Sequence, residues 1–248
     1  MTQANDFHKE ILNTIDSFLH KNDYESAEKH LLKHLEQATQ SKDFATEILL
    51  RNELMGLYRK LGKGQKAVEM VEAVIMLIEE KGLESNIGSA TTFLNSATVY
   101  KAFGSPEKSI RLFEKAKSIY EQKLAPDDER LGGLYNNMAL TLVDLKRFDE
   151  AKLFNEKAIE IMKNKPLEIA ITYLNMATAS ETELGLLEAH EEITELLTKA
   201  KALLENHRNR DGYYAFVCEK CASVFGYYGD FLYDEELQSR ARRIYEGT

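Results

Sequence analysis

A repeated pattern of small and apolar residues runs through most of the 248-residue chain and constrains its fold more than any other feature. In Leu134–Met162, LYNNMALTLVDLKRFDEAKLFNEKAIEIM, Ala139 is followed by Ala151 twelve residues later and by Ala158 after seven more. The second position of this frame falls at Ala27, Ala67, Ser109, Ala151, Ala189 and Asp234, at spacings of 40, 42, 42, 38 and 45 residues. Six copies of one structural unit are therefore predicted, and the last has a carboxylate where the others have a small residue.

The residue pattern of each copy predicts two helices joined by a turn. In the third copy, Leu94, Ala97 and Tyr100 share one helical face, and Ile110 and Phe113 begin the face of a second helix. The chain has only three prolines, so helix breakers are few. The turn positions include Gly62, Gly104 and Gly229, where the end of a helix favours a positive φ.

The pattern predicts an all-α fold of stacked helix–turn–helix hairpins, because a single hairpin cannot bury its apolar faces alone. We expect one solenoid domain spanning residues 1–248. Its predicted repeats are 6–42, 43–83, 84–125, 126–165, 166–207 and 208–248.

The repeat resembles the tetratricopeptide repeat (TPR) family, in a longer form of about 42 residues. The segment Ala125–Met162, APDDERLGGLYNNMALTLVDLKRFDEAKLFNEKAIEIM, is particularly similar to the repeats of kinesin light chains and their bacterial relatives. The resemblance covers residues 6–246 and implies a right-handed α-solenoid superhelix of about six repeats that binds a peptide or protein segment in its concave groove.

An asparagine recurs two residues before the first small position, at Asn13, Asn95, Asn137 and Asn175. Asparagine is a mediocre helix former, so its return on a helix needs a reason. A side-chain amide can bond the N–H and the C=O of a peptide backbone whatever its sequence, and the resemblance implies this role for Asn95, Asn137 and Asn175. The candidate groove residues are Asn95, Asn137, Asn175, Thr91, Thr98, Asn136, Asp144 and Thr178. In the alternative interpretation, the asparagines bond neighbouring helices and hold the superhelix together.

The net charge and the first residues of the chain indicate which partners and which location to expect. Thirty-two Lys and Arg residues against 41 Asp and Glu residues give a net charge of −9, which disfavours nucleic acid as a partner. The first residues have neither the basic nor the apolar region of a signal peptide, and no apolar run approaches the length of a membrane span. We expect a cytoplasmic protein with no membrane partner.

No residue pattern supports catalysis or a cofactor. His30 and His34 have a spacing that can seat zinc, but no third ligand is evident. Cys218 and Cys221 form a C-x-x-C without the βαβ context of a redox motif, so we interpret them as packed thiols. No phosphate-binding loop or nucleophile motif is visible. The prediction is a non-enzyme with no metal and no cofactor.

The sequence therefore predicts a protein–protein interaction scaffold or adaptor. One alternative is a peptide-sensing regulator related to bacterial quorum-sensing receptors with similar repeats, although the early start of the repeats leaves no room for an effector segment before them. Another is a structural assembly subunit. The last copy is crowded with Tyr and Phe, from Tyr213 to Tyr233. These aromatics predict either a cap on the open core or a contact through which two copies form a homodimer.

Overall fold

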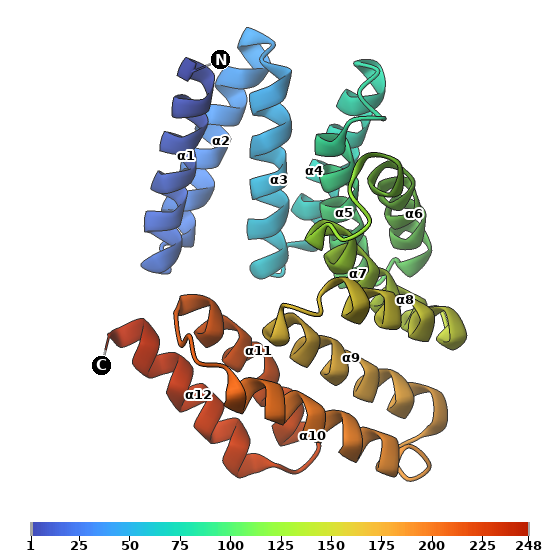
Figure 1. The fold of residues 1–248 in the computed structure, drawn as a ribbon. Coiled ribbons are helices and arrows are strands. Elements are labelled where there is room, and N and C mark those ends of the chain that lie inside the picture. The colour runs from blue at the N-terminus through green and yellow to red at the C-terminus, as the bar shows by residue number, and fades with distance from the viewer. Residues whose placement is uncertain (1, 248) are drawn as a thin grey trace. The chain divides into compact units, whose positions relative to one another are not determined.

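The structure, a computed structural model, describes residues 2–247, which form twelve helices and no strand (Figure 1). Consecutive helices pair into six hairpins, so the predicted all-α fold of solenoid type, built from helical repeats, is confirmed. The helices are α1 (Thr2–His20), α2 (Tyr24–Ser41), α3 (Phe44–Lys60), α4 (Gly64–Glu80), α5 (Ile87–Ala102), α6 (Pro106–Lys123), α7 (Glu129–Asp144), α8 (Phe148–Ile161), α9 (Pro166–Leu184), α10 (His190–Asn206), α11 (Gly212–Tyr227) and α12 (Phe231–Glu246).

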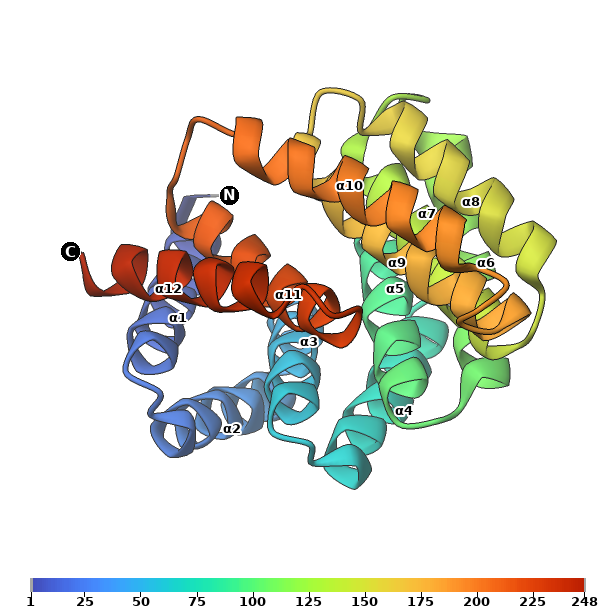
Figure 2. The ribbon, with the colours of Figure 1, turned by 90° about the horizontal axis from the view of Figure 1, so that it is seen from below.

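The chain divides into two compact units, Met1–Lys123 and Leu124–Thr248. The first unit contains α1–α6, and its first helices α3 and α5 contact each other. The second unit contains α7–α12 (Figure 2). Within it, α9 contacts both α7 and α11, the first helices of the hairpins on either side. The assignment of all 248 residues to one domain stays a prediction.

Local sequence sets where helices begin and end. Asp side chains cap five helices by accepting a backbone N–H, which satisfies a donor that the helix leaves free. These caps are Asp23, Asp43, Asp128, Asp211 and Asp230. Gly62, Gly104 and Gly229 have φ of +67°, +73° and +93°, as their turn positions predict. Asn22 and Lys146 adopt the same left-handed conformation in the first and fourth hairpins.

The small repeat positions lie in the core. Ala97, Ala139 and Ala158 are buried, as expected for places where two helices approach closely. In the second unit, one buried cluster joins residues of α9 and α10 to Cys218, Phe225 and Leu237 of the last hairpin. The exception to the small-residue rule, Asp234 on α12, lies against Gly226 on α11, where the missing side chain leaves room for the carboxylate.

Candidate functional site

Two of the predicted asparagines pair with an amide on the first helix of the preceding hairpin. Asn95 Nδ2 on α5 donates to Asn52 Oδ1 on α3 at 2.9 Å. In the second unit, Asn175 Nδ2 on α9 donates to Asn136 Oδ1 on α7 at 3.0 Å. These bonds link helices 43 and 39 residues apart in the chain, about one repeat. Asn95 and Asn175 therefore link neighbouring helices, as the alternative interpretation of the pattern proposes.

The partners lie one place earlier in the frame than the recurring asparagine. Asn52 and Asn136 stand three residues before the small position, whereas Asn95 and Asn175 stand two residues before it. Asn52 is not among the residues predicted from the sequence, although its offset from Asn95 equals one repeat plus one residue. Asn136 was predicted as a groove residue; it is almost fully buried, and its oxygen positions Asn175.

The remaining predicted polar residues bond mainly within their own hairpin. Asn137 Nδ2 donates to the Gly133 carbonyl at 2.8 Å, on the same helix. The hydroxyls of Thr98 and Thr178 likewise donate to carbonyls three and four residues earlier, as helical threonines often do. Thr91 shares a 2.7 Å hydrogen bond with the Tyr120 hydroxyl on α6. Asp144, the last residue of α7, is exposed.

These hydrogen bonds use one N–H of each asparagine amide and leave its oxygen without a donor. Asn95, Asn137 and Asn175 are half-buried, and each has given one N–H to a neighbour. Among the described residues, no hydrogen bond is made to the Oδ1 atoms of these three residues. Each amide therefore presents an oxygen that can accept a hydrogen bond from a ligand.

A pocket of about 580 Å³ lies where the three first helices of the second unit begin. Its wall includes Gly133 of α7, Glu168 of α9 and Tyr213 of α11. Lys165, also in the wall, forms an ion pair with Glu129 at 2.9 Å. Burial raises the pKa of Glu168, while Lys220 and Lys165 oppose that rise. The pocket thus combines an aromatic ring with charges of both signs.

A second hollow, of about 510 Å³, lies further along α9 and α11 and includes Thr178 and Tyr227. Its Glu181 carboxylate accepts hydrogen bonds from the hydroxyls of Tyr227 at 2.7 Å and Tyr228 at 2.8 Å. Burial, followed by the bond to Glu181, raises the pKa of Tyr228. The two hollows lie toward opposite ends of α9 and α11, with Asn175 between them in sequence.

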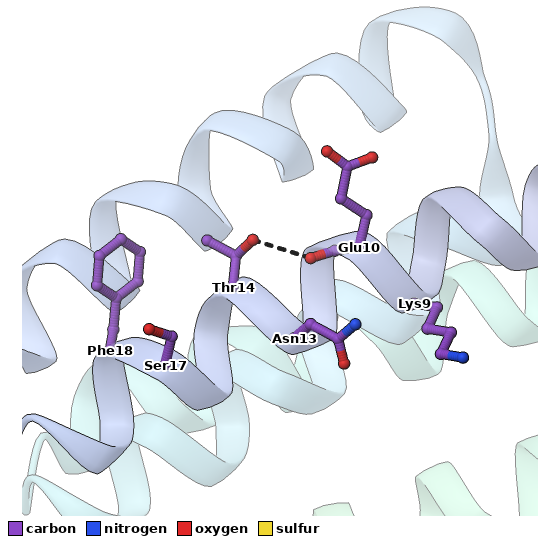
Figure 3. A pocket seen from close by; sticks show the side chains of 6 residues that line it. All are labelled: Lys9, Glu10, Asn13, Thr14, Ser17 and Phe18. Atoms are coloured by element: carbon purple, nitrogen blue, oxygen red, sulfur yellow. Dashed lines mark hydrogen bonds between the residues drawn. The ribbon is translucent and has the colours of Figure 1, made fainter.

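In the first unit, the predicted Asn13 lines a shallow pocket of about 510 Å³ on α1 (Figure 3). All six lining residues come from this one helix: Lys9, Glu10, Asn13, Thr14, Ser17 and Phe18. Thr14 donates to the Glu10 carbonyl at 2.9 Å, and the Asn13 amide points away from the Glu10 carboxylate. A surface made by one helix offers less enclosure than the pockets of the second unit.

Residues 88–164 match the family model described as tetratricopeptide repeat. This segment, from α5 to the end of α8, is therefore similar to tetratricopeptide repeats. Among curated proteins, no sequence matches this chain.

Solved structures support the same fold. BtubC (BKLC) from P. vanneervenii is 21% identical, with a TM-score of 0.68 over 81% of this chain and 82% of that one. Nearly identical TPR-like repeats from a Podosopora anserina chain assigned to the kinesin light chains are 20% identical, with a TM-score of 0.54 over 78% of this chain and 92% of that one. The Rap conjugation gene regulator of plasmid pLS20, in complex with the Phr* peptide, is 14% identical, with a TM-score of 0.61 over 98% of this chain and 63% of that one. At these identities the likeness concerns the fold alone.

The structure buries the thiols of Cys218 and Cys221 and leaves His30 and His34 half-buried. Burial raises the pKa of the Cys218 thiol and raises that of Cys221 to about 12, so both stay protonated near neutral pH. His30 and His34 lie with ring centroids 4.5 Å apart, and His30 Nε2 and His34 Nδ1 are buried without a hydrogen-bond partner. Within the described residues, no three His, Cys, Asp or Glu side chains form a group that could hold a metal ion.

The aromatic side chains of the last hairpin are divided between the core and the exposed surface. Tyr214, Phe225 and Tyr233 are buried, and Tyr233 meets Phe225 edge-on at 4.8 Å between centroids. Tyr227 and Phe231 are more than half exposed.

None of the helices in the described part of the chain has the length and apolar character needed to span a bilayer.

Proposed function

We propose that this chain is a non-catalytic binding scaffold that holds an extended segment of a peptide or protein against the first helices of its repeats. The observation that carries the proposal is the face of α7, α9 and α11 in the second unit. On it, the amide oxygens of Asn137 and Asn175 are free to accept, and the two hollows flank Asn175 in sequence. We assign the same role in the first unit to Asn95, Thr91 and Thr98 on α5.

The chemistry suits a peptide backbone. An extended segment presents an N–H about every 6.6–7 Å along each edge, and a fixed amide oxygen can accept it without regard to the side chain. The hollows can then select side chains: the larger one has the Tyr213 ring and charged groups, and the other has Thr178 and the Tyr227 ring.

The dimensions also fit a short segment. Leu167 lines the first hollow and Thr178 the second, eleven residues apart on one helix. At a rise of 1.5 Å per residue this separation is about 16 Å, which about five extended residues can span. We therefore propose a recognition motif of five to seven residues, about as long as this distance requires.

The structural likeness to a Rap regulator in complex with the Phr* peptide supports a peptide as the ligand class. That complex also favours the second candidate function, a peptide-sensing regulator in which ligand binding changes contacts with another protein. A structural assembly subunit is the third candidate. In addition, we propose that two copies can pair through the exposed Phe231 and Leu232 of the last hairpin.

The test begins with selection of phage-displayed random peptides on the immobilised full chain. The affinity of an enriched peptide is then measured by fluorescence polarisation. Asn137→Ala breaks only a bond within its own helix, so the fold should persist and loss of the acceptor should weaken binding about 3- to 10-fold. Asn206→Ala, an exposed asparagine at the end of α10, is the matched control and should bind like the wild type.

Tyr227→Ala is a second probe of the same surface, because this ring is 69% exposed and its loss removes little packing. It should weaken the same peptide. The proposal would be contradicted if no peptide were enriched, or if Asn137→Ala and Tyr227→Ala both bound the peptide as tightly as Asn206→Ala.

A further inference from the structure

A separate pocket of about 230 Å³ lies among α8, α9 and α10, and neither Asn175 nor Thr178 lines it. Part of its lining is apolar and includes Phe148, Ala151 and Met176. Its polar lining comes from all three helices. None of these residues enters the proposed peptide surface.

Asn155 is the unusual member of this wall. It shares a buried face of α8 with Ala151, Phe154 and Ala158, and it is 2% exposed. Its Oδ1 atom is buried and accepts no hydrogen bond. A buried acceptor without a partner costs on the order of 1–3 kcal/mol, so its presence in a core face calls for a donor that arrives from outside.

The other polar groups around the pocket favour a positively charged donor. Asp149, Glu183 and Glu192 line it, and none of them forms an ion pair within the described residues; Lys152 is the one basic residue in the wall. Ser180 adds a hydroxyl that makes no hydrogen bond in the described part of the chain. Three carboxylates against one ammonium give the lining a net charge of −2.

We propose that this pocket binds the side chain of a lysine carried by a partner polypeptide. The aliphatic stem would lie along Phe148, Ala151 and Met176, as lysine stems cover apolar surface elsewhere. The ammonium group would donate to Ser180 Oγ and, once the Asn155 amide turns its buried Oδ1 toward the pocket, to that oxygen as well, while the carboxylates neutralise the charge. An ammonium has three donors that rotate freely, which suits single oxygens on different helices better than the planar fork of arginine does. A metal ion is disfavoured, since the three carboxylates do not form a group that could hold one.

The test measures binding to the full chain by NMR, with the Asn155 side-chain amide signal as the reporter. The probe is Nα-acetyl-lysine methylamide, and Nα-acetyl-norleucine methylamide is the comparison with the same stem and no charge. The lysine probe should shift the Asn155 signal saturably with a Kd on the order of 1–10 mM, as expected for one side chain, and the norleucine probe should not. Equal binding of both probes, or no saturable shift, would overturn the proposal.

Variants separate the contributions. Asn155→Leu removes the unpartnered oxygen and should leave the protein at least as stable as the wild type in a thermal melt. Isothermal titration calorimetry of this variant should show loss of the lysine probe's binding, and unchanged affinity would refute the role of Asn155.

Glu183→Gln with Glu192→Gln should weaken binding about threefold, since each exposed ion pair contributes little. Glu188→Gln with Glu191→Gln has the same charge change outside the pocket and should bind like the wild type. Equal weakening by both pairs would mean a general effect of charge and overturn the site.

Two further ligands test whether the positive charge that binds in the pocket belongs to a lysine side chain, a free amine or a metal ion. Butylammonium binding without binding of the lysine probe would indicate a site for a free amine and refute a polypeptide partner. A shift produced by calcium chloride at lower concentration than by the lysine probe would replace the proposal with a metal site.

Discussion

The last hairpin contains a compensating pair that a double substitution can test. In the other five copies the position of Asp234 is Ala or Ser, and Asp234 is accommodated because Gly226 faces it from α11. A Cβ atom built on Gly226 would lie 3.1 Å from Asp234 Cγ and 3.3 Å from Asp234 Cβ. Rotation of the carboxylate alone cannot relieve both contacts, so Gly226→Ala should strain the α11–α12 interface.

The magnitude follows from two opposing effects. Gly226 has helical backbone geometry, and alanine is favoured over glycine within a helix by about 1 kcal/mol. Overpacking of a close contact costs about 1–3 kcal/mol. Gly226→Ala should therefore lower the free energy of unfolding by about 1 kcal/mol in total. With Asp234→Ala in the same chain the larger clash is removed, so the double variant should recover that loss, with a coupling energy of about 1–2 kcal/mol.

Urea denaturation followed by far-UV circular dichroism measures these differences. Gly56→Ala is the matched control, because Gly56 lies within α3 and a Cβ there would meet nothing within 4 Å. This control should raise stability by about 1 kcal/mol through helix propensity alone. If Gly226→Ala stabilised the protein as much as Gly56→Ala does, the close approach to Asp234 would have no energetic consequence and the reasoning would be refuted.

Two other predictions concern charge and self-association. Glu28 on α2 contacts the ammonium groups of Lys63 at 2.5 Å and Lys66 at 2.7 Å, and these bonds lower its pKa to about 2. A lowered folded pKa contributes stability above the unfolded value near 4.5 and loses it as the pH falls toward 2. Glu28→Gln should therefore lower the melting temperature at pH 7 and flatten its dependence on pH between 5 and 2, and a wild-type melt independent of pH in this range would argue against the ion pairs. For the proposed pairing of two copies, light scattering should give a mass that rises with concentration for the wild type and not for a Phe231→Ser, Leu232→Ser variant; a wild-type mass that stays monomeric would exclude it.

Much of the fold follows from the spacing of small residues. Alanine at positions such as Ala97 and Ala139 marks where two helices approach closely, and the turn between the helices of a hairpin needs one residue with positive φ. Both signals are local and repeat along the chain, so each copy supports the assignment of the others. The division into two compact units has no such local signal, because the chain between α6 and α7 resembles the other connections between hairpins.

The candidate site was harder to predict because its hydrogen bonds cross between repeats. A recurring asparagine indicates that a polar group is needed, but not whether the neighbouring helix or a ligand supplies its partner. The partner amides, Asn52 and Asn136, each stand one residue out of the repeat frame. The shift depends on how two helices pack side by side, which the periodicity of a single helix does not encode. Likewise, the roles proposed for the Tyr213 ring and the Asn155 oxygen depend on residues of other helices, which the sequence pattern of one helix does not identify.

The packing role and the proposed binding role of the asparagines support each other. An amide that donates one N–H to a neighbouring helix loses the freedom to rotate, so its oxygen is held in one direction before any ligand arrives. A preorganised acceptor costs less conformational entropy on binding than a free side chain does. In the proposed site, the bond from Asn175 to Asn136 therefore stabilises the contact between α9 and α7 and also aims the Asn175 oxygen. A free asparagine on the same face would bind a peptide backbone less well, although it would have one more N–H to offer.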